Sequence, residues 1–600
     1  MQTTQTPASA IEPEARDTGA PAPAAPAAPA APGAEGPGPV RLTAPGAADA
    51  GDAAPTATGG AGPVQFTAPG AADTGEAAST AAAGAGDAAS PTTGGAGPVP
   101  PAAGEPAPAV PVFTGGVQVL FGDEGDVATL VGPTTSIAVR PVRGAVRAAL
   151  GRLAEGALPA EELYAGLLPA ERVHVERILG RARHLLAHAV LARGSRRVLV
   201  RLEPVARDAA YEPVAVRPDA TVRLSRFAFC RSREGALVLE SPLVKYRAVL
   251  TDAAARTLAA ALGAPGTPGR LGADAGLDAE STTDVLAHLV GAGFAELADE
   301  DGAFASDAEP VLRQWDFHDL LFHSRIRSGR YDDVFGAVYP HRGAIEPRPA
   351  VKPVPEGPSM PLYRPTREEI AERDPSLTTA IETRRSIRGY GEQEMTARQL
   401  GEFLYRVARV RAHYTPEPGS TRDEVVSRPY PSGGQGYELE LYVTVRRCAG
   451  LEPGIYYYDP VGHRLVLRNE EEADRESLFH VASRATGMEA RPDVLVTVTA
   501  RFQRMSWKYR AIAYATTLRH TGVLYQTMYL VATALGLAPC ALGNGDADMS
   551  ARVLGLDYLQ ESSVGDFLLG SRRPDDSVAG EPGEGWRMLN SPEWSLPDNP

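Results

Sequence analysis

Residues 428–445 read RPYPSGGQGYELELYVTV, a glycine-rich loop that leads directly into an alternating apolar stretch. From Tyr437 to Val445 every second side chain is apolar, which predicts a β-strand with one buried face. Glycines let the backbone approach a flat ligand closely, and the strand that follows fixes the position of the loop. A turn that only leads into the strand would explain the glycines equally well. The loop lacks the Gly-Lys-Ser/Thr of phosphate loops and is not the dinucleotide fingerprint.

Helices and strands mix around this loop without a strict β-α-β alternation. Asp374-Pro375 is an N-cap candidate followed by a proline at the first helical position. Thr396-x-x-Gln399 matches a capping box that opens a second helix. A long helix is expected over about residues 511–535, ending at Gly536. We therefore predict an α+β fold over residues 374–575, with a mixed, mainly antiparallel sheet and packed helices.

The first 110 residues differ in composition from the rest of the chain. They hold 72 Ala, Gly or Pro, a single aromatic residue and no lysine. Such a segment cannot bury enough apolar surface to offset the entropy of ordering, so we predict a disordered tail over residues 1–110. The stretch at 38–49 recurs at 62–73 without the apolar periodicity of a solenoid, which favours a duplicated linker over a partner-docking motif.

Charge and cysteine content narrow the classes of function. The tail carries a net charge of −8 out of −15 for the chain, which leaves −7 for the rest and argues against a nucleic-acid binder. Three widely spaced cysteines exclude a disulfide scaffold and a four-cysteine zinc site. The sequence has no run of 18 apolar residues and no signal peptide, so we expect a cytoplasmic protein without a membrane partner.

Two stretches before the α+β unit share an order of elements. Residues 111–215 and 216–345 each predict helices followed by a short hairpin, as in a winged-helix unit, and the second ends in a helical connector. The helix expected at 282–293 offers few basic side chains for a DNA groove, so we expect it to bind a peptide or a subunit. Residues 346–373 form a Pro-rich linker, and residues 576–600 a C-terminal tail.

His184 and His188 lie four residues apart in a stretch, 170–192, that we expect to be helical. This spacing can bind a metal ion, but no third ligand is evident nearby. We therefore expect a solvated helix face and no metal site.

The densest group of charges is Arg384-Arg385-Ser386-Ile387-Arg388, directly after the helix that begins at Pro375. Guanidinium groups offer paired donors that suit a phosphate. Basic residues are also favoured in the last turn of a helix by its dipole, so both interpretations stay open on these residues alone.

Together with the loop at 430–437 and the GLAP sequence at 536–539, this arginine group resembles the flavin-binding pattern of the nitroreductase superfamily. The chain is more closely similar to the SagB-type azoline dehydrogenases, which form thiazoles and oxazoles in ribosomal peptides. The segments that carry this narrower likeness are WDFHDLLFHSR at 315–325, SGR at 328–330, YPSGG at 430–434, PGIYYYDP at 453–460 and WKYR at 507–510.

The resemblance implies that the protein binds FMN at the interface of a homodimer. Transferred by position, the residues at the phosphate and ribityl end are Arg384, Arg385, Ser386 and Arg388, with Arg572 and Arg573 closing over the phosphate. The residues at the isoalloxazine are Ser432, Gly433 and Gln435, and those at the flavin edge are Gly543 and Asn544.

In the family, a ring proton is removed and a hydride passes to the flavin, which oxygen reoxidises, so a general base is required. Some relatives place a Lys-Tyr pair in the loop after Ser-Gly-Gly, where this chain has Gly436-Tyr437. Three alternatives stay open: Tyr437 acts alone, Lys508 supplies the amine from another segment, or the reaction differs. A packing role for Tyr437 also stays open, because it lies on the alternating strand face.

The leading hypothesis is an FMN-dependent dehydrogenase that oxidises azoline rings to azoles in a modified precursor peptide, working with a cyclodehydratase. One alternative is an NAD(P)H-dependent flavin reductase that acts on nitro compounds or quinones. The other is a scaffold that docks the peptide and catalyses nothing.

Overall fold

The computed structural model describes residues 106–122, 126–132, 135–418, 420, 422–487 and 491–574. The repeat at 38–49 and 62–73, the rest of the predicted tail up to residue 105, and the C-terminal tail at 576–600 lie outside the described residues. The prediction of disorder up to residue 110 is wrong at its end, because the N–H of Ala107 donates to Asp284 at 2.8 Å and a strand begins at Val110. No helix in the described ranges combines the length and apolar character needed to cross a membrane.

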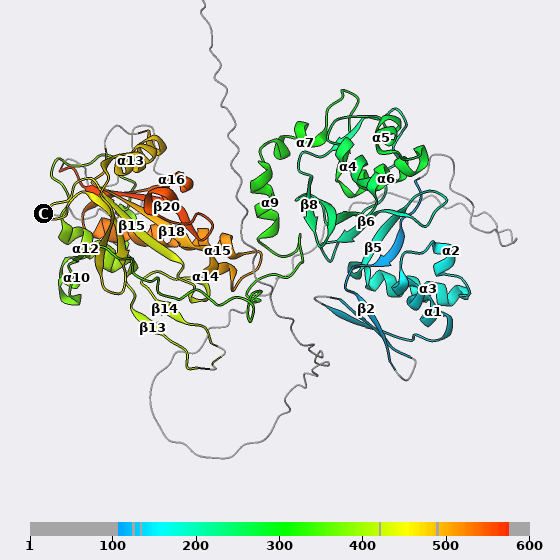
Figure 1. Ribbon diagram of the computed structural model, residues 1–600, viewed down its shortest axis with the longest axis horizontal. Coiled ribbons are helices and arrows are strands. Elements are labelled where there is room, and N and C mark those ends of the chain that lie inside the picture. The colour runs from blue at the N-terminus through cyan, green and yellow to red at the C-terminus, as the bar shows by residue number, and fades with distance from the viewer. Residues whose placement is uncertain are drawn as a thin grey trace, which may run out of the picture. The chain divides into compact units, whose positions relative to one another are not determined.

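The N-terminal part is built on a six-stranded antiparallel sheet (Figure 1). Its strands in spatial order are β1 (Val110–Phe113), β5 (Leu186–Leu191), β6 (Val198–Pro204), β10 (Tyr246–Leu250), β9 (Ala236–Glu240) and β8 (Phe229–Arg233). Strands from both predicted winged-helix-like units therefore share one sheet, and residue 215 does not separate two sheets.

Helices follow the strands in both stretches of this part. The first stretch holds the small sheet β2 (Gln118–Phe121), β3 (Ala128–Val131) and β4 (Ser136–Val139), then α1 (Gly144–Glu155), α2 (Ala160–Leu163) and α3 (Pro169–Arg181). The second holds α4 (Ala253–Ala261), α5 (Pro268–Ala275) and α6 (Ala279–Ala292), and then β11 (Ala295–Leu297), which pairs with β7 (Val222–Leu224). Asp252 and Asp278 cap α4 and α6 by accepting backbone N–H groups.

The helix expected over residues 170–192 is wrong beyond Arg181. The chain leaves the helix and residues 186–191 form β5, because pairing with β1 and β6 satisfies their backbone groups. His188 therefore lies in a strand, where its ring meets the edges of Tyr211 and Tyr246 at 5.5 and 5.9 Å. Burial lowers the pKa of His188. Across the described ranges, no three potential ligand side chains gather to hold a metal ion.

A connector joins the two parts. It begins with the short helices α7 (Ala305–Ala308), α8 (Pro310–Arg313) and α9 (Phe317–Arg325) and ends with the strand β12 (Ser359–Pro361). β12 joins the C-terminal sheet at β17, so the chain enters the C-terminal domain as an edge strand.

The C-terminal domain is α+β, as the sequence predicts. Its seven-stranded sheet is antiparallel at every pairing and runs β12, β17 (Arg464–Asn469), β16 (Gly454–Asp459), β15 (Leu439–Val445), β18 (Val494–Arg501), β20 (Glu561–Ser571) and β19 (Leu537–Leu542). A small hairpin of β13 (Ala412–Tyr414) and β14 (Val425–Ser427) precedes the glycine-rich loop. The helices are α10 (Arg367–Arg373), α11 (Leu377–Thr383), α12 (Ala397–Ala408), α13 (Glu472–Thr486), α14 (Phe502–Ser506), α15 (Ala513–Ala534) and α16 (Ala547–Leu554).

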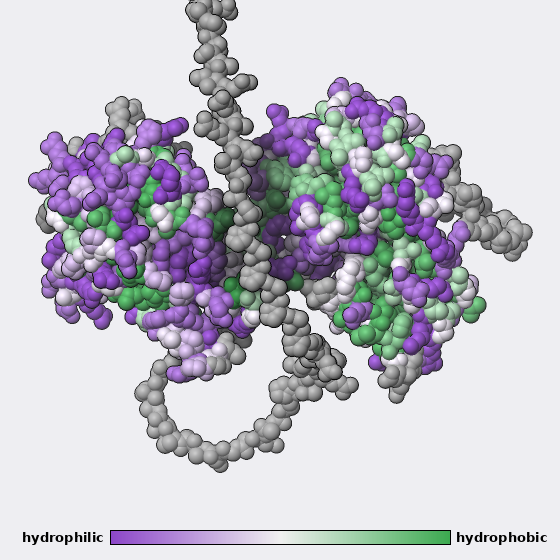
Figure 2. Space-filling model, viewed as in Figure 1, coloured by the Kyte–Doolittle hydropathy of each residue, from purple (hydrophilic) through white to green (hydrophobic). Residues whose placement is uncertain are grey.

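Helices cover both faces of this sheet, so it is the middle of three layers. Leu441 and Val443 of β15 share a core with α12 and α15, whereas Tyr442 shares a core with α13 and α16. Successive side chains of a strand point to opposite faces, which explains why both sets are buried. β15 is therefore buried on both faces, not on one as expected. Polar residues dominate the visible surface of this domain, with smaller apolar patches between them (Figure 2).

Two helix ends test the capping predictions. The side chain of Thr396 and that of Gln399 form the predicted capping box of α12. The predicted cap at Asp374 is wrong, because Ser376 caps α11 and Asp374 closes the unforeseen helix α10. The Asp374 carboxylate instead pairs with Arg406.

Candidate functional site

The glycine-rich loop between β14 and β15 has an unusual backbone. Gly434, Gln435 and Tyr437 all have positive φ angles, of 58°, 55° and 42°. A Cβ atom at Gly434 would lie 2.2 Å from the hydroxyl oxygen of Tyr509, so only glycine fits there. The loop is held within itself by the N–H of Tyr437, which donates to Ser432 Oγ at 3.0 Å.

Three side chains from the following segments hold the backbone of this loop. The N–H of Gly433 donates to His520 Nε2 at 2.6 Å. Lys508 Nζ donates to the carbonyl of Gly434 at 3.0 Å, and Arg504 Nε to that of Gly436 at 3.2 Å. The loop is therefore fixed by α14, α15 and the turn between them.

Glu438 and His520 are functional candidates that the sequence analysis missed. Both are buried, and His520 Nδ1 lies 2.8 Å from Glu438 Oε1. Since Nε2 accepts a hydrogen bond from Gly433, the proton of a neutral imidazole lies on Nδ1 and is donated to the carboxylate. An acid in the first residues of the predicted strand and a histidine within the predicted long helix are the signal that could have found them.

The two predicted catalytic residues have different surroundings. Tyr437 is 6% exposed, belongs to the main core of the domain and meets Tyr430 edge-on at 5.5 Å. Lys508 presents its amine to the loop carbonyl and lies 3.9 Å from Asp423 Oδ2. Lys508 is thus the better placed of the two to meet a ligand, and the phenol of Tyr509, which the sequence analysis missed, lies beside it at Gly434.

The arginine group follows α11 and runs beside the end of the sheet. The guanidinium of Arg384 lies 5.1 Å above the ring of Tyr529, and Ser386 Oγ lies 2.6 Å from its hydroxyl. The N–H of Ile387 donates to Pro539 O at 2.8 Å, so the group lies against β19. Arg384 and Arg385 are half-buried and Arg388 is exposed.

The structure brings the C-terminal arginines to the same place. Arg573 Nε donates to the carbonyl of Tyr390 at 3.1 Å, and Gly391 N–H donates to the carbonyl of Ser571 at 3.0 Å. Arg572 and Arg573 therefore lie beside the segment that follows Arg388.

Gly543 and Asn544 line a separate cavity with Thr521, Tyr525 and Asp566. Burial raises the pKa of the Asp566 carboxyl to about 6, although Thr497 donates a hydrogen bond to it at 2.7 Å. The buried hydroxyl oxygen of Tyr525 has no hydrogen-bond partner within the described part of the chain. These predicted residues are not joined to the glycine-rich loop in one cavity.

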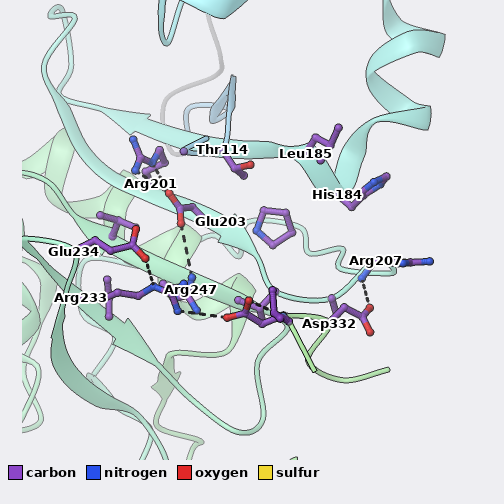
Figure 3. Close-up of a pocket in the computed structure, with 18 of the residues that line it drawn as sticks. Thr114, His184, Leu185, Arg201, Glu203, Arg207, Arg233, Glu234, Arg247 and Asp332 are labelled. Atoms are coloured by element: carbon purple, nitrogen blue, oxygen red, sulfur yellow. Dashed lines mark hydrogen bonds and ion pairs between the residues drawn. The ribbon is translucent and has the colours of Figure 1, made fainter. Parts of the chain in front are cut away.

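A further cavity lies on the sheet of the N-terminal part (Figure 3). Arg201 pairs with Glu203 at 2.7 Å, and Arg247 pairs with the buried Glu240 at 2.7 Å. At its rim, the N–H of Arg207 donates to Asp332 at 2.9 Å. None of the predicted site residues lies in this cavity. The charged side chains of Arg201 and Arg247 in its wall are engaged in ion pairs.

Two family models match the chain. Residues 222–332 match the cyanobactin oxidase ThcOx, and residues 381–570 match the nitroreductase family. A protein of Methanocaldococcus jannaschii that carries the name nitroreductase is 31% identical over 187 residues, which cover 31% of this chain and 85% of that protein.

Two relatives are named for the processing of microcin B17 and of trifolitoxin. The microcin B17-processing protein McbC of Escherichia coli is 31% identical over 135 residues, 21% of this chain and 46% of McbC. The trifolitoxin-processing protein TfxB of Rhizobium leguminosarum bv. trifolii is 28% identical over 149 residues, 24% of this chain and 40% of TfxB. The chain therefore spans less than half the length of each of these two relatives.

Among solved structures, the E. coli microcin synthetase McbBCD complex with truncated pro-MccB17 bound is similar, with a TM-score of 0.26 and 23% identity. The match covers 31% of this chain and 70% of the solved chain.

Proposed function

Because the chain belongs to the nitroreductase family, we propose that it is an FMN-dependent dehydrogenase that oxidises azoline rings to azoles in a ribosomally made peptide. The region that matches a cyanobactin oxidase, followed by the nitroreductase domain, supports this choice. So do the similarities to two proteins named for processing microcin B17 and trifolitoxin. The wider partners we propose are a precursor peptide and a cyclodehydratase.

The residues present fit FMN. A dianionic phosphate needs cations, and the group at 384–388 would supply guanidiniums and the Ser386 hydroxyl, with Arg573 held nearby at the Tyr390 carbonyl. The glycine-rich loop would offer backbone groups to the ring system, and the side chains of Tyr509, Lys508 and His520 lie against its glycines. When bound, FMN would accept the hydride, which carries two electrons and one proton.

The position of Lys508 is the observation that carries the proposal. Oxidation of an azoline breaks two ring C–H bonds: one hydrogen leaves as a proton and the other leaves with its electron pair, and a ring double bond forms. A base is needed for the proton, whereas a simple reductase needs none at this place. The Lys508 amine is held at the loop by the carbonyl of Gly434 and is 17% exposed, so it can meet a ring bound there.

We assign the other residues supporting roles. His520 and Arg504 hold the loop rigid, so that the distance between the Lys508 amine and a bound ring is fixed. Tyr437 packs beneath the loop and keeps water from its inner side.

We further propose a homodimer in which the flavin site is completed by a second copy. The cavity at Gly543 and Asn544 lies apart from the loop in one chain, and it contains an unpartnered tyrosine hydroxyl. Tyr514 and Leu518 of α15, which also line this cavity, are 49% and 39% exposed, which suits a surface that a partner covers. The predicted winged-helix-like units at 111–215 and 216–345 would hold the peptide.

The test is the absorbance spectrum of the purified full chain under anaerobic conditions. We expect a yellow protein that releases about one FMN per chain and is bleached by an azoline peptide. Bleaching by NADPH without peptide would favour the reductase alternative. A colourless protein that takes up no added FMN would overturn the proposal and leave the scaffold alternative.

A further inference from the structure

We propose that Asp423 is a positioning residue that sets the protonation of Lys508, and that Arg342 of the connector tunes it from the other side. This inference rests on the proposed function, because it concerns the residue proposed as the general base. Asp423 lies just before β14, and Arg342 lies in the chain that enters the C-terminal domain.

The two oxygens of Asp423 serve two different cations. Oδ1 accepts from Arg342 at 3.1 Å, and Oδ2 lies 3.9 Å from Lys508 Nζ. The Asp423 side chain is 22% exposed and Lys508 is 17% exposed, so their interaction is only partly screened by water. Among the described residues, Asp423 is the carboxylate that pairs with Lys508.

The connector is fastened to the segment that carries Lys508. The N–H of Tyr339 donates to the Lys508 carbonyl at 3.1 Å, and Gly336 and Arg510 exchange two backbone hydrogen bonds at 3.1 and 2.9 Å. The indole N–H of Trp507 donates to the carbonyl of Ile345 at 2.6 Å. These bonds hold Arg342 and Lys508 in a fixed relation to the same carboxylate.

Tyr339 links the two cations. The Arg342 guanidinium lies 4.0 Å from the centre of its ring, and Lys508 Nζ lies 5.6 Å from it. Burial and the negative charge of Asp423 raise the pKa of Tyr339. Asp423 is therefore the centre of a cluster of three groups.

Other titratable groups near Lys508 are already engaged. Tyr509 contributes its ring at 5.9 Å from Nζ. Glu424 lines a cavity together with Asp423 and Lys508. It accepts from Ala350 N–H at 2.7 Å and contacts His413 at 2.6 Å. Arg504 is committed to the Gly436 carbonyl, and burial lowers its pKa to about 10.

The sign of each charge gives two opposite expectations. The negative charge of Asp423 favours the ammonium form of Lys508, so Asp423→Asn lets the amine lose its proton at a lower pH. Arg342 competes for the same carboxylate, so Arg342→Gln makes the amine keep its proton to a higher pH. A merely structural role would not move the two variants in opposite directions.

The experiment is trace acylation of the full chain with acetic anhydride across pH 6 to 11, read by peptide mass spectrometry. The chain has three lysines, Lys245, Lys352 and Lys508, so each is followed separately. We expect the pH of half-maximal labelling at Lys508 to fall by about 0.5–1 unit in Asp423→Asn, and to rise by a smaller amount in Arg342→Gln.

Lys245 offers a matched control, because it forms a separate ion pair with Asp208. Both residues are distant from Lys508 in the sequence. Asp208→Asn should lower the labelling midpoint of Lys245 and leave that of Lys508 unchanged. An unchanged Lys508 midpoint in Asp423→Asn, or shifts of the same sign in both variants, would overturn the inference. If Asp423→Asn does not fold, the exposed Arg342→Gln variant still tests the inference. Its labelling midpoint at Lys508 must rise, and a fall or no change would overturn the inference.

The labelling needs neither flavin nor peptide. If the two variants shift the Lys508 midpoint in opposite directions but the protein oxidises no azoline, the role of Asp423 stands and the proposed function fails. If the protein oxidises azolines but the variants do not show these shifts, the proposed function stands and the role of Asp423 fails.

Discussion

One ring nitrogen of His520, Nδ1, lies 2.8 Å from a carboxylate oxygen of Glu438, while the opposite nitrogen accepts the N–H of Gly433 at 2.6 Å. A buried acid thus fixes the tautomer of a histidine, and the histidine fixes a glycine-rich loop. The two residues are 82 positions apart, so this pair exists only in the folded domain.

His520→Ala should loosen the loop and weaken flavin binding. The variant leaves the Gly433 N–H without its acceptor and Glu438 without its donor, which costs about 1–3 kcal/mol. We expect the Kd for FMN to rise by about tenfold, measured by quenching of flavin fluorescence. The control is His480→Ala on the exposed side of α13, which should leave the Kd unchanged. Equal Kd values for the two variants would contradict the role of His520.

Arg384→Gln and Arg388→Gln test the phosphate site. Loss of one guanidinium from a charged hydrogen bond should cost about 1.5–3 kcal/mol, or about tenfold or more in FMN affinity. Riboflavin lacks the phosphate, so its affinity should not change. Arg367→Gln, at the exposed start of α10, is the matched control. If FMN and riboflavin lose affinity equally, the arginines do not hold the phosphate.

Gly434→Ala should destabilise the loop because its φ is 58° and its Cβ would meet the Tyr509 hydroxyl. A non-glycine residue in this conformation costs about 1–2 kcal/mol before the steric contact is added. Gly522→Ala in α15 is the control, since nothing lies within 4 Å of its Cβ position, and it should stabilise by about 0.5–1 kcal/mol. Thermal unfolding at pH 7 distinguishes the two, and a Gly434→Ala protein as stable as the parent would refute the strained loop.

Asp566 predicts a pH dependence of stability. Its pKa is raised to about 6 in the folded protein, above the value of 3.8 expected when unfolded. The folded state therefore keeps this proton to a higher pH than the unfolded state does. The resulting stabilisation is complete below about pH 4 and is lost as the pH rises to about 6. Between pH 4 and pH 7.5 the parent should lose about 2–3 kcal/mol of its free energy of unfolding through this carboxyl. Asp566→Asn should not show this loss, because its side chain does not titrate.

The measurement for Asp566 is denaturant unfolding of both proteins at the two pH values. A constant difference in the free energy of unfolding would mean that the carboxyl titrates normally. Thr497→Val, which removes the donor at 2.7 Å, should raise the pKa of Asp566 further and steepen the loss.

Local signals in the sequence predicted much of the C-terminal domain. The capping box at Thr396 and Gln399 needs only residues three apart, and the helix ending at Gly536 needs only its own apolar content and a left-handed stop. The arginine group at 384–388 was found because its three charges lie within five residues of sequence. Arg573 lies beside this group at the carbonyl of Tyr390, a neighbourhood that no local pattern in the sequence indicates.

Where the prediction failed, distant contacts decided the outcome. His188 lies in a stretch with helical character, but pairing with β1 and β6 makes it a strand. Asp374 has the residue type of an N-cap, but in the structure it is the C-cap of the preceding helix, α10. Glu438 and Asp423 gain their roles only from His520 and Arg342, which no local spacing connects.

The most direct test of the central claim is the mass of an azoline peptide after incubation with the FMN-loaded full chain and oxygen. We predict a loss of two hydrogens per ring with the parent protein and with Lys245→Ala, and a large loss of rate with Lys508→Ala while FMN stays bound. An unchanged peptide mass with FMN bound, with a cyclodehydratase also present, would contradict the claim that this protein oxidises azolines.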